Sequence, residues 1–236
     1  MARTAAVFFD VDFTLIHPAP RFQGVGYQES CARHGVRVNA AAFEAAVAGA
    51  ASVLDSAGQV YDADLYVQYT RRIIELMGGA GPNVLTVARE MYEEWAEHEH
   101  FSLYDDVPDA LRALQAGGVR LGLISNSHRC LASFQSHFEL EGLISATVSS
   151  SDHGYMKPHP NIFRAALALL GVPADEAVMV GDSLTHDVIG AIQAGLRGVW
   201  LARGAPSSTA DPGVPMIRSL AELPALLCPR EISGAA

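Results

Sequence analysis

Residues 7–15 read VFFDVDFTL, an apolar run that ends abruptly in two carboxylates one residue apart and then a hydroxyl. The apolar residues 5–9 predict a buried strand. Acids at the end of such a strand are hard to explain as core, because a buried carboxylate without a partner is strongly disfavoured. We therefore interpret Asp10 and Asp12 as the active-site edge of a parallel sheet, where they need positively charged partners.

The composition limits the fold and the partners. The chain has 236 residues and is 50% hydrophobic, which is enough for a substantial core in one large domain or two smaller ones. Its net charge is −10 at pH 7 and its pI is near 5.3. Because nucleic acids and anionic membranes require a basic face, we expect neither as a partner.

The three cysteines, Cys31, Cys130 and Cys228, are far apart and lack a CxxC spacing. They indicate neither a disulfide framework nor a zinc site, so reduced thiols are expected. No uninterrupted apolar stretch approaches the roughly 20 residues that a membrane span needs. These features favour a cytoplasmic protein and leave the oligomeric state open.

Two kinds of pattern divide the chain. Residues 17–102 contain apolar residues at helical spacing, glycines between the helical runs and no convincing strand. From Asp106 onward, helical runs alternate with short apolar runs, which is typical of a parallel α/β sheet. We predict an α/β core built from residues 1–16 and 103–236, with an all-helical insertion at 17–102.

The alternating part predicts individual elements. Asp106 is expected to cap the first helix, with Pro108 in its first turn, and Gly117 and Gly118 are expected to end it. Residues 233–236 are expected to fray. The predicted strands are 119–124, 146–148, 177–180 and 198–201, and the predicted helices are 127–137, 160–170, 185–194 and 220–227.

Polar residues follow several predicted strands at the same end. They are Asp10 and Asp12, then Ser125 and Asn126, then Asp182, with Asp187 in the first turn of the next helix. Ligands of open parallel sheets bind at the carboxyl ends of the strands, so these side chains are expected to converge. Several carboxylates this close together would repel one another or take up protons. Mg²⁺ resolves the conflict, since it prefers oxygen ligands and keeps room for water and a phosphate.

A site that handles phosphate in an acidic protein also needs a fixed cation. A lone lysine is most often a solvated surface charge. Lys157, however, lies near the end of the third predicted strand, in a loop stiffened by Pro158 and Pro160. Lys157 is therefore the candidate counter-charge, with the Ser125 hydroxyl and the start of the following helix as further anion-binding elements.

The motifs together resemble those of the haloacid dehalogenase superfamily of phosphohydrolases. Residues 10–14, DVDFT, resemble its opening DxDxT signature, and Ser125 with Asn126 resembles its second motif. Lys157 with Pro158 resembles the third motif, and residues 181–187 resemble the acidic fourth. This resemblance covers nearly the whole chain and implies a Rossmann-like three-layer core with a mostly parallel sheet and a small helical cap after the first motif.

The resemblance implies roles for the acidic residues. Asp10 would be the nucleophile that forms an aspartyl-phosphate, and Asp12 would protonate the leaving alcohol and later activate water. Mg²⁺ would be bound by Asp10, by the backbone carbonyl of Asp12, and by Asp182. Asp187 would bind the metal directly or through water.

The remaining motif residues would position the phosphoryl group. By the resemblance, Thr14, Ser125 and Asn126 would hold its oxygens. Lys157 would orient Asp10 and offset charge in the transition state. Phe13 departs from the family pattern, which commonly has glycine at that position.

The expected activity is Mg²⁺-dependent hydrolysis of a small phosphorylated metabolite. A sugar phosphomutase would share the aspartyl-phosphate. A 2-haloacid dehalogenase is less favoured, because that reaction needs neither a metal nor an acid at the position of Asp12. The third alternative is a binding module that holds a phosphorylated metabolite without turnover.

Overall fold

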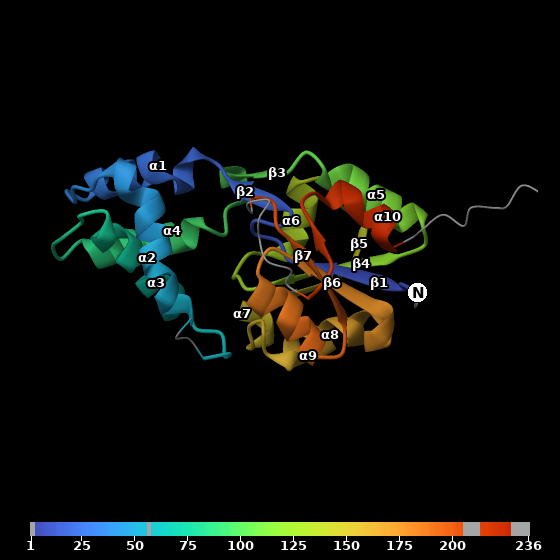
Figure 1. Cartoon of the computed structure of the whole chain (residues 1–236). Coiled ribbons are helices and arrows are strands. Elements are labelled where there is room, and N and C mark those ends of the chain that lie inside the picture. Colours follow the sequence, from blue (N-terminus) through green and yellow to red (C-terminus); the bar gives the residue numbers. More distant parts are fainter. Residues whose placement is uncertain (1–2, 56–57, 205–212, 228–236) are drawn as a thin grey trace, which may run out of the picture. The chain divides into compact units, whose positions relative to one another are not determined.

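The computed structural model describes residues 3–55, 58–204 and 213–227 (Figure 1). These residues form two compact units. The first, which we call the core, comprises the described parts of Met1–Ile16, Leu103–Asn126 and Leu131–Ala236. The second, the helical unit, comprises the described parts of His17–Ser102 together with Ser127–Cys130.

A parallel sheet of six strands organises the core, in the order β5-β4-β1-β6-β7-β8. All four residues of β1 are buried, which explains why this strand is continuously apolar rather than alternating. The strands are β1 Ala6–Phe9, β4 Arg120–Ser125, β5 Ile144–Ser149, β6 Ala177–Gly181, β7 Arg197–Leu201 and β8 Met216–Ile217.

Helices cover both faces of this sheet, with α5 and α10 on one face and α8 and α9 on the other (Figure 1). Pro160 begins α8 and Gly171 ends it in the left-handed region, at φ 59°, as the sequence predicts. The core helices are α5 Val107–Ala116, α6 Leu131–His137, α7 Ser150–His153, α8 Pro160–Leu170, α9 Gly190–Gln193 and α10 Leu223–Leu227.

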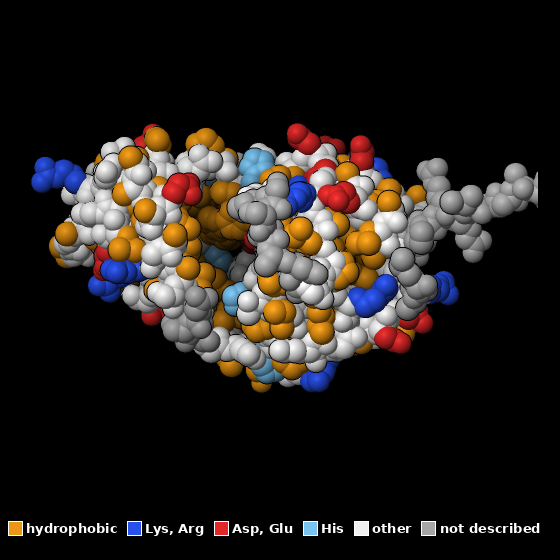
Figure 2. All heavy atoms as spheres, viewed as in Figure 1, with side chains coloured by type: hydrophobic (Ala, Val, Ile, Leu, Met, Phe, Trp, Pro, Cys, Tyr) orange, Lys and Arg blue, Asp and Glu red, His pale blue; other side chains and the backbone are white. Residues whose placement is uncertain are grey.

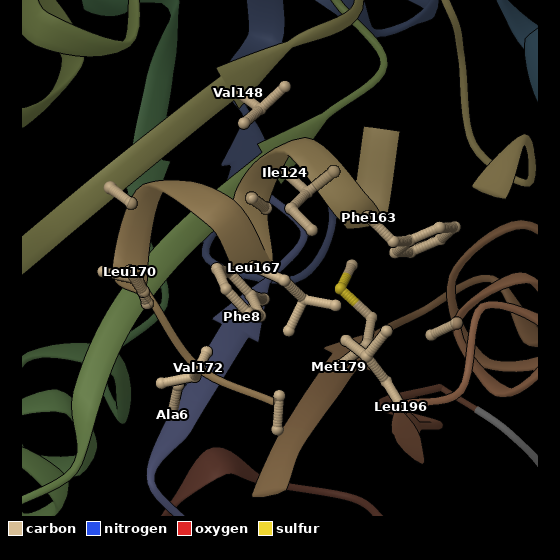
Figure 3. Packing of buried hydrophobic residues seen from close by; sticks show 14 of the residues in the cluster. Ala6, Phe8, Ile124, Val148, Phe163, Leu167, Leu170, Val172, Met179 and Leu196 are labelled. Carbon is tan, nitrogen blue, oxygen red and sulfur yellow. The ribbon is translucent and has the colours of Figure 1, made fainter. Parts of the chain in front are cut away.

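The apolar face of α8 packs against the centre of the sheet (Figure 3). Phe163 and Leu167 from the helix meet Phe8, Ile124 and Met179 from β1, β4 and β6. Burying a side chain of this size stabilises the fold by about 1.5–3 kcal/mol relative to exposure. This packing fixes the three strands whose ends carry the predicted site.

The helical unit is built on α3, which packs against both α2 and α4. Its buried residues Val67, Ile73 and Ile74 lie on one face. Between α3 and α4, a glycine-rich turn reverses the chain. The helices are α1 Gly24–Arg33, α2 Phe43–Asp55, α3 Ala63–Leu76 and α4 Val84–Glu94, with short 3-10 turns at Pro20–Phe22, Ala40–Ala42 and His98–His100.

The expectation of a strand-free insertion is wrong at its two ends. The short strands β2 Ile16–Pro18 and β3 Phe101–Leu103 pair with each other. They are far apart in sequence, so a local pattern does not reveal the pairing.

The helix predicted at 127–137 begins only at Leu131. Residues Ser127–Cys130 instead belong to the helical unit, where the Arg129 guanidinium lies 4.2 Å from the Phe101 ring centre and donates to the Ala96 carbonyl at 3.4 Å. The aromatic contact and the hydrogen bond stabilise residues 127–130 in a non-helical conformation.

Two further helices differ from their predicted form. The helix expected at 185–194 is a π-helical turn, Leu184–Ile189, followed by α9. The helix expected at 220–227 starts as the 3-10 turn Leu220–Glu222.

Asp106 precedes α5, but its carboxylate does not cap that helix, so the predicted side-chain cap is wrong. The carboxylate accepts hydrogen bonds from Arg203, from the Ser219 hydroxyl and from the Leu220 N–H.

Cys31 is a buried free thiol, and Cys130 is exposed. Cys228 and residues 233–236 lie outside the described residues. Among the helices of the described ranges, none has the length and apolar character that crossing a bilayer requires. On the face shown in Figure 2, basic side chains are scattered and do not gather into a broad patch.

Candidate active site

The predicted site forms where β1 lies between β4 and β6. The chain runs from β1 to β4 and β5 on one side and then returns to β6 on the other, so β1 marks a topological switch point. Phe9 is in register with both Leu123 and Val180, and the Asp10 N–H donates to the Val180 carbonyl at 2.9 Å. The register therefore places Asp10 at the carboxyl edge of the sheet, beside the end of β6.

Three carboxylates converge at this edge. Asp10, Asp182 and Asp187 each offer an oxygen, and these oxygens all lie within 4.8 Å of one another. Asp187 is only 1% exposed. Burial, with the charges of Asp10 and Asp187, raises the pKa of Asp182 to about 8. Burial also raises the pKa of Asp187 to about 6, although Lys157 opposes that increase. Without a bound cation, the cluster therefore retains protons at pH values where isolated aspartates have lost them.

Lys157, the only lysine in the sequence, is buried among these acids. Its Nζ lies 2.5 Å from Asp10 Oδ1 and 2.6 Å from Asp187 Oδ1. Burial lowers the pKa of this ammonium, but the two carboxylates outweigh that effect and hold the pKa above its ordinary value. Lys157 is therefore a permanently charged group between Asp10 and Asp187, and not a solvated surface charge.

Asn126 fixes the backbone of that lysine. The Asn126 side-chain amide donates to the Lys157 carbonyl at 2.9 Å, and its oxygen accepts the Lys157 N–H at 2.7 Å. The end of β4 and the loop before α8 are thus joined by a two-way hydrogen bond. Ser125, the last residue of β4, is fully buried beside it.

Thr14 joins the first and fourth motifs. Its hydroxyl donates to Asp10 Oδ2 at 3.4 Å and accepts the Asp182 N–H at 3.1 Å, and the residue is fully buried. One hydroxyl therefore helps to orient two of the three clustered acids.

The loop after β6 is shaped around Asp187. Asp187 Oδ2 accepts the Ser183 N–H at 3.0 Å, and the Ser183 hydroxyl accepts the His186 N–H at 3.1 Å. A Cβ on Gly181 would lie 2.1 Å from Asp187 Oδ2, so only glycine leaves room for the carboxylate at this point. Asp12, which is partly exposed, lies beyond the end of β1 and is not among the three clustered carboxylates.

Comparison with known proteins identifies the family. The model of the haloacid dehalogenase-like hydrolases matches residues 4–195. The chain belongs to the haloacid dehalogenase-like hydrolase family. It is 30% identical over 231 residues to haloacid dehalogenase-like hydrolase domain-containing protein 3 of Danio rerio, covering 94% of this chain and 95% of that protein. It is 35% identical over 167 residues to the N-acylneuraminate-9-phosphatase of Rattus norvegicus, covering 66% of this chain and 64% of that enzyme.

Solved structures of the same family share the fold. A HAD phosphatase from Thermococcus onnurineus superposes with a TM-score of 0.64 at 26% identity, covering 95% of this chain and 98% of that chain. A 2-haloacid dehalogenase from Pseudomonas syringae superposes with a TM-score of 0.63 at the same identity and the same coverage. The family assignment, the α/β fold and the hydrolase class are therefore confirmed.

The acidic cluster of this haloacid dehalogenase-like hydrolase fits a hard divalent cation. Three carboxylates provide the oxygen donors that Mg²⁺ prefers, and one lysine cannot neutralise all three. Burial first, and then the neighbouring carboxylates, raise the pKa values of Asp182 and Asp187, and a bound cation would oppose both effects. The donor set is the observation that supports a metal here.

Sequence reasoning missed two residues that support this hydrolase's site from β7 and the loop after it. The Trp200 indole donates to the Asp182 carbonyl at 2.9 Å, and Arg203 donates to the Thr14 carbonyl at 3.0 Å. Both are at the carboxyl end of β7, so extending the strand-end rule to that strand would have identified them as candidates.

Phe13, the departure from the family pattern, adopts a left-handed backbone with φ 63°, and the residue is 44% exposed. We expect Phe13→Gly to be more stable than Phe13→Ala by about 1–2 kcal/mol, because only glycine adopts this conformation without strain. Both variants lose the same ring, so their difference isolates the backbone contribution. Urea unfolding measures it, and an alanine variant at least as stable as the glycine variant would contradict the account.

Proposed function

We propose that the chain is a Mg²⁺-dependent phosphatase that hydrolyses a small phosphorylated metabolite through an aspartyl-phosphate at Asp10. The observation that carries this proposal is the contact of Lys157 with both Asp10 and Asp187, inside a cluster of three carboxylates. A nucleophilic carboxylate, a fixed cation and a metal-binding donor set are the groups that phosphoryl transfer requires.

In this mechanism the Asp10 carboxylate attacks phosphorus in line with the leaving oxygen. The 2.5 Å contact with Lys157 and the hydrogen bond from Thr14 fix the orientation of that carboxylate before substrate arrives. Lys157 also offsets negative charge on the transferring group. Bound Mg²⁺, held by Asp10, Asp182, Asp187 and the Asp12 carbonyl, would supply further positive charge for the phosphoryl oxygens.

Asp12 would act as the general acid and then as the general base. It would first protonate the leaving alcohol and then take a proton from the water that attacks the phosphorylated Asp10, returning the nucleophile to its carboxylate form. Ser125 and Asn126 would hold phosphoryl oxygens at the end of β4. The buried Thr14 hydroxyl donates its one proton to Asp10, so it would orient the nucleophile and not bind the substrate. In the same proposal, residues 17–102 serve as the cap that gives substrate specificity and excludes water.

The closest competing activities share this architecture. A phosphomutase would return the phosphoryl group to a sugar, giving an isomerised sugar phosphate without free phosphate. A dehalogenase would release halide without need of a metal, and the cluster of Asp10, Asp182 and Asp187 argues for a reaction that uses one. The free thiol of Cys31 supports a reducing, cytoplasmic location.

Phosphate release tests the proposal. The screen should contain an aryl phosphate, sugar phosphates, nucleotides, phosphoglycolate and phosphoamino acids, each with Mg²⁺ and with EDTA. We expect phosphate release from at least one substrate in Mg²⁺ and loss of the activity in EDTA. Metabolite binding without any hydrolysis would favour a binding module, and EDTA-insensitive halide release from a 2-haloacid would favour the dehalogenase.

The raised pKa values predict how pH affects the metal-free protein. Asp182 and Asp187 have pKa values of about 8 and 6 when folded, above the ordinary 3.8. The folded protein then holds more protons than the unfolded chain, so the contribution of these groups to stability falls as pH rises through 6 and 8. Because a metal displaces those protons, the stabilisation by Mg²⁺ is expected to grow over the same range.

Urea unfolding in EDTA and in saturating Mg²⁺, at about pH 5.5, 7 and 8.5, measures this effect. Asp182→Asn is the matched control, because it removes the group with the largest shift while keeping its size. The control should show a weaker dependence on pH and a smaller response to Mg²⁺. A Mg²⁺ response that stays constant from pH 5.5 to 8.5 in the parent protein would contradict the assignment of these acids.

A further inference from the structure

Arg203 follows β7 and lies outside the four motifs, but it makes several close contacts. Its Nη1 donates to Asp106 Oδ2 at 2.9 Å and its Nη2 donates to Asp106 Oδ1 at 2.8 Å. The guanidinium carbon lies 3.9 Å from the centre of the Tyr104 ring. Bidentate pairing and stacking together restrict the position of this side chain far more than a single ion pair would.

Asp106 is itself fixed. Its Oδ2 also accepts the Ser219 hydroxyl at 2.6 Å and the Leu220 N–H at 2.8 Å, which ties it to the turn before α10. Burial raises the pKa of Asp106, but the hydrogen bonds from Arg203 and Ser219 outweigh it and leave the pKa below its ordinary value. The pair therefore stays ionised at neutral pH, so that Arg203 retains its charged partner.

The same guanidinium reaches the first motif. Arg203 Nη2 donates to the Thr14 carbonyl at 3.0 Å, and the Thr14 hydroxyl contacts both Asp10 Oδ2 and the Asp182 N–H. Hydrogen bonds thus link Asp106 to Arg203 and Arg203 to the Thr14 carbonyl. The hydroxyl of the same threonine is hydrogen-bonded to two of the clustered acids. Each of these hydrogen bonds lies within the core unit.

We propose that Arg203 is a positioning residue for the reaction at Asp10. It holds the Thr14 backbone, and through it the hydroxyl that orients Asp10 and the N–H of Asp182. This inference rests on the proposed phosphatase function for its kinetic part, because phosphoryl transfer depends mainly on placement of the reacting groups. The part of the inference that concerns metal binding does not depend on turnover. Asp182 is a predicted metal ligand, and its backbone N–H is held by the Thr14 hydroxyl.

Three variants test the proposal. Arg203→Met keeps much of the aliphatic stem but removes all the hydrogen bonds, and Arg203→Lys keeps the charge without the planar fork. Arg197→Met is the matched control. Arg197 begins the same strand and donates to the Thr4 hydroxyl at 2.8 Å, at the amino ends of the strands and away from the site. Each protein is measured for thermal midpoint, for kcat and KM with an aryl phosphate, and for Mg²⁺ affinity by calorimetry.

We expect Arg203→Met to lower kcat by about 100-fold, the size of effect that a 1 Å misplacement produces. Mg²⁺ affinity should fall by about 10-fold, as for other residues that orient metal ligands. Arg203→Lys should recover part of both losses, and Arg197→Met should change neither at temperatures where it is folded. KM should change less than kcat in the Arg203 variants, because a positioning residue acts through Thr14 on Asp10 and not on the substrate.

A thermal midpoint that falls while kcat and Mg²⁺ affinity match the control would overturn the proposal and make Arg203 a structural residue only. If Arg203→Met does not fold, Arg203→Lys decides the question by the same comparison. If the parent protein shows no hydrolysis, the phosphatase proposal fails by itself. In that case the Mg²⁺ affinities of the variants and control alone support or reject the positioning role.

Discussion

Asp10→Asn is expected to lower kcat by about 10⁴-fold or more, the largest loss that we predict for any single substitution. The amide has nearly the size and shape of the carboxylate but lacks the negative oxygen that must attack phosphorus. The substitution removes the charge that faces Lys157, but Lys157 keeps its contact with Asp187, and the Thr14 hydroxyl and the Asp10 N–H keep their partners. The variant should therefore fold and lose the chemical step.

Phosphate release from an aryl phosphate in saturating Mg²⁺ measures this loss. Arg197→Met serves again as a control that leaves the site intact. Circular dichroism and urea unfolding establish that the Asp10 variant is folded at the assay temperature. Activity close to that of the parent protein in a folded Asp10→Asn variant would rule out Asp10 as the nucleophile.

Lys157→Met is expected to reduce the free energy of unfolding of the metal-free protein by about 3–5 kcal/mol at neutral pH, the usual effect of removing one partner from a buried ion pair. Asp10 and Asp187 then face each other without the ammonium that lies 2.5 and 2.6 Å from them. Mg²⁺ should restore part of the lost stability, because it supplies positive charge to the same carboxylates. Urea unfolding with EDTA and with Mg²⁺ measures both effects.

A double variant separates lost charge pairing from lost packing. In Asp10→Asn/Lys157→Met, one of the unpaired acids is gone, so the combined destabilisation should be smaller than the sum of the two single effects. Additive losses would indicate that Lys157 stabilises the site through its aliphatic stem alone. A metal-free Lys157→Met protein as stable as the parent would contradict the buried pairing.

The convergence of the candidate residues could be predicted because three of the four motifs directly follow a strand, and parallel strands place their carboxyl ends at one edge. Asp10, Asp182 and Asp187 are brought together by the order β4-β1-β6. The alternating pattern predicts a parallel sheet but not this order. Lys157 was identified by the need for a counter-charge, and its burial between Asp10 and Asp187 meets that need. In these positions local sequence and topology agree.

The features that could not be predicted depend on contacts between distant parts of the chain. The strands β2 and β3 pair although the helical unit separates them in the sequence, and no local sequence pattern predicts such a pairing. Asp106 looks like a helix cap in its own sequence, but Arg203, 97 residues later, binds its carboxylate instead. Phe13 occupies a position that favours glycine, and a sequence pattern does not reveal its left-handed backbone.

Trapping of the covalent intermediate tests the central claim most directly. In Asp12→Asn, an aryl phosphate with a good leaving group still phosphorylates the enzyme, because little acid assistance is needed, whereas breakdown is slowed by loss of the general base. Borohydride reduction after rapid mixing, followed by peptide mass spectrometry, locates the acyl phosphate. We predict modification at Asp10 alone. Turnover by the parent protein without modification of Asp10, or with modification of another residue, would contradict the account.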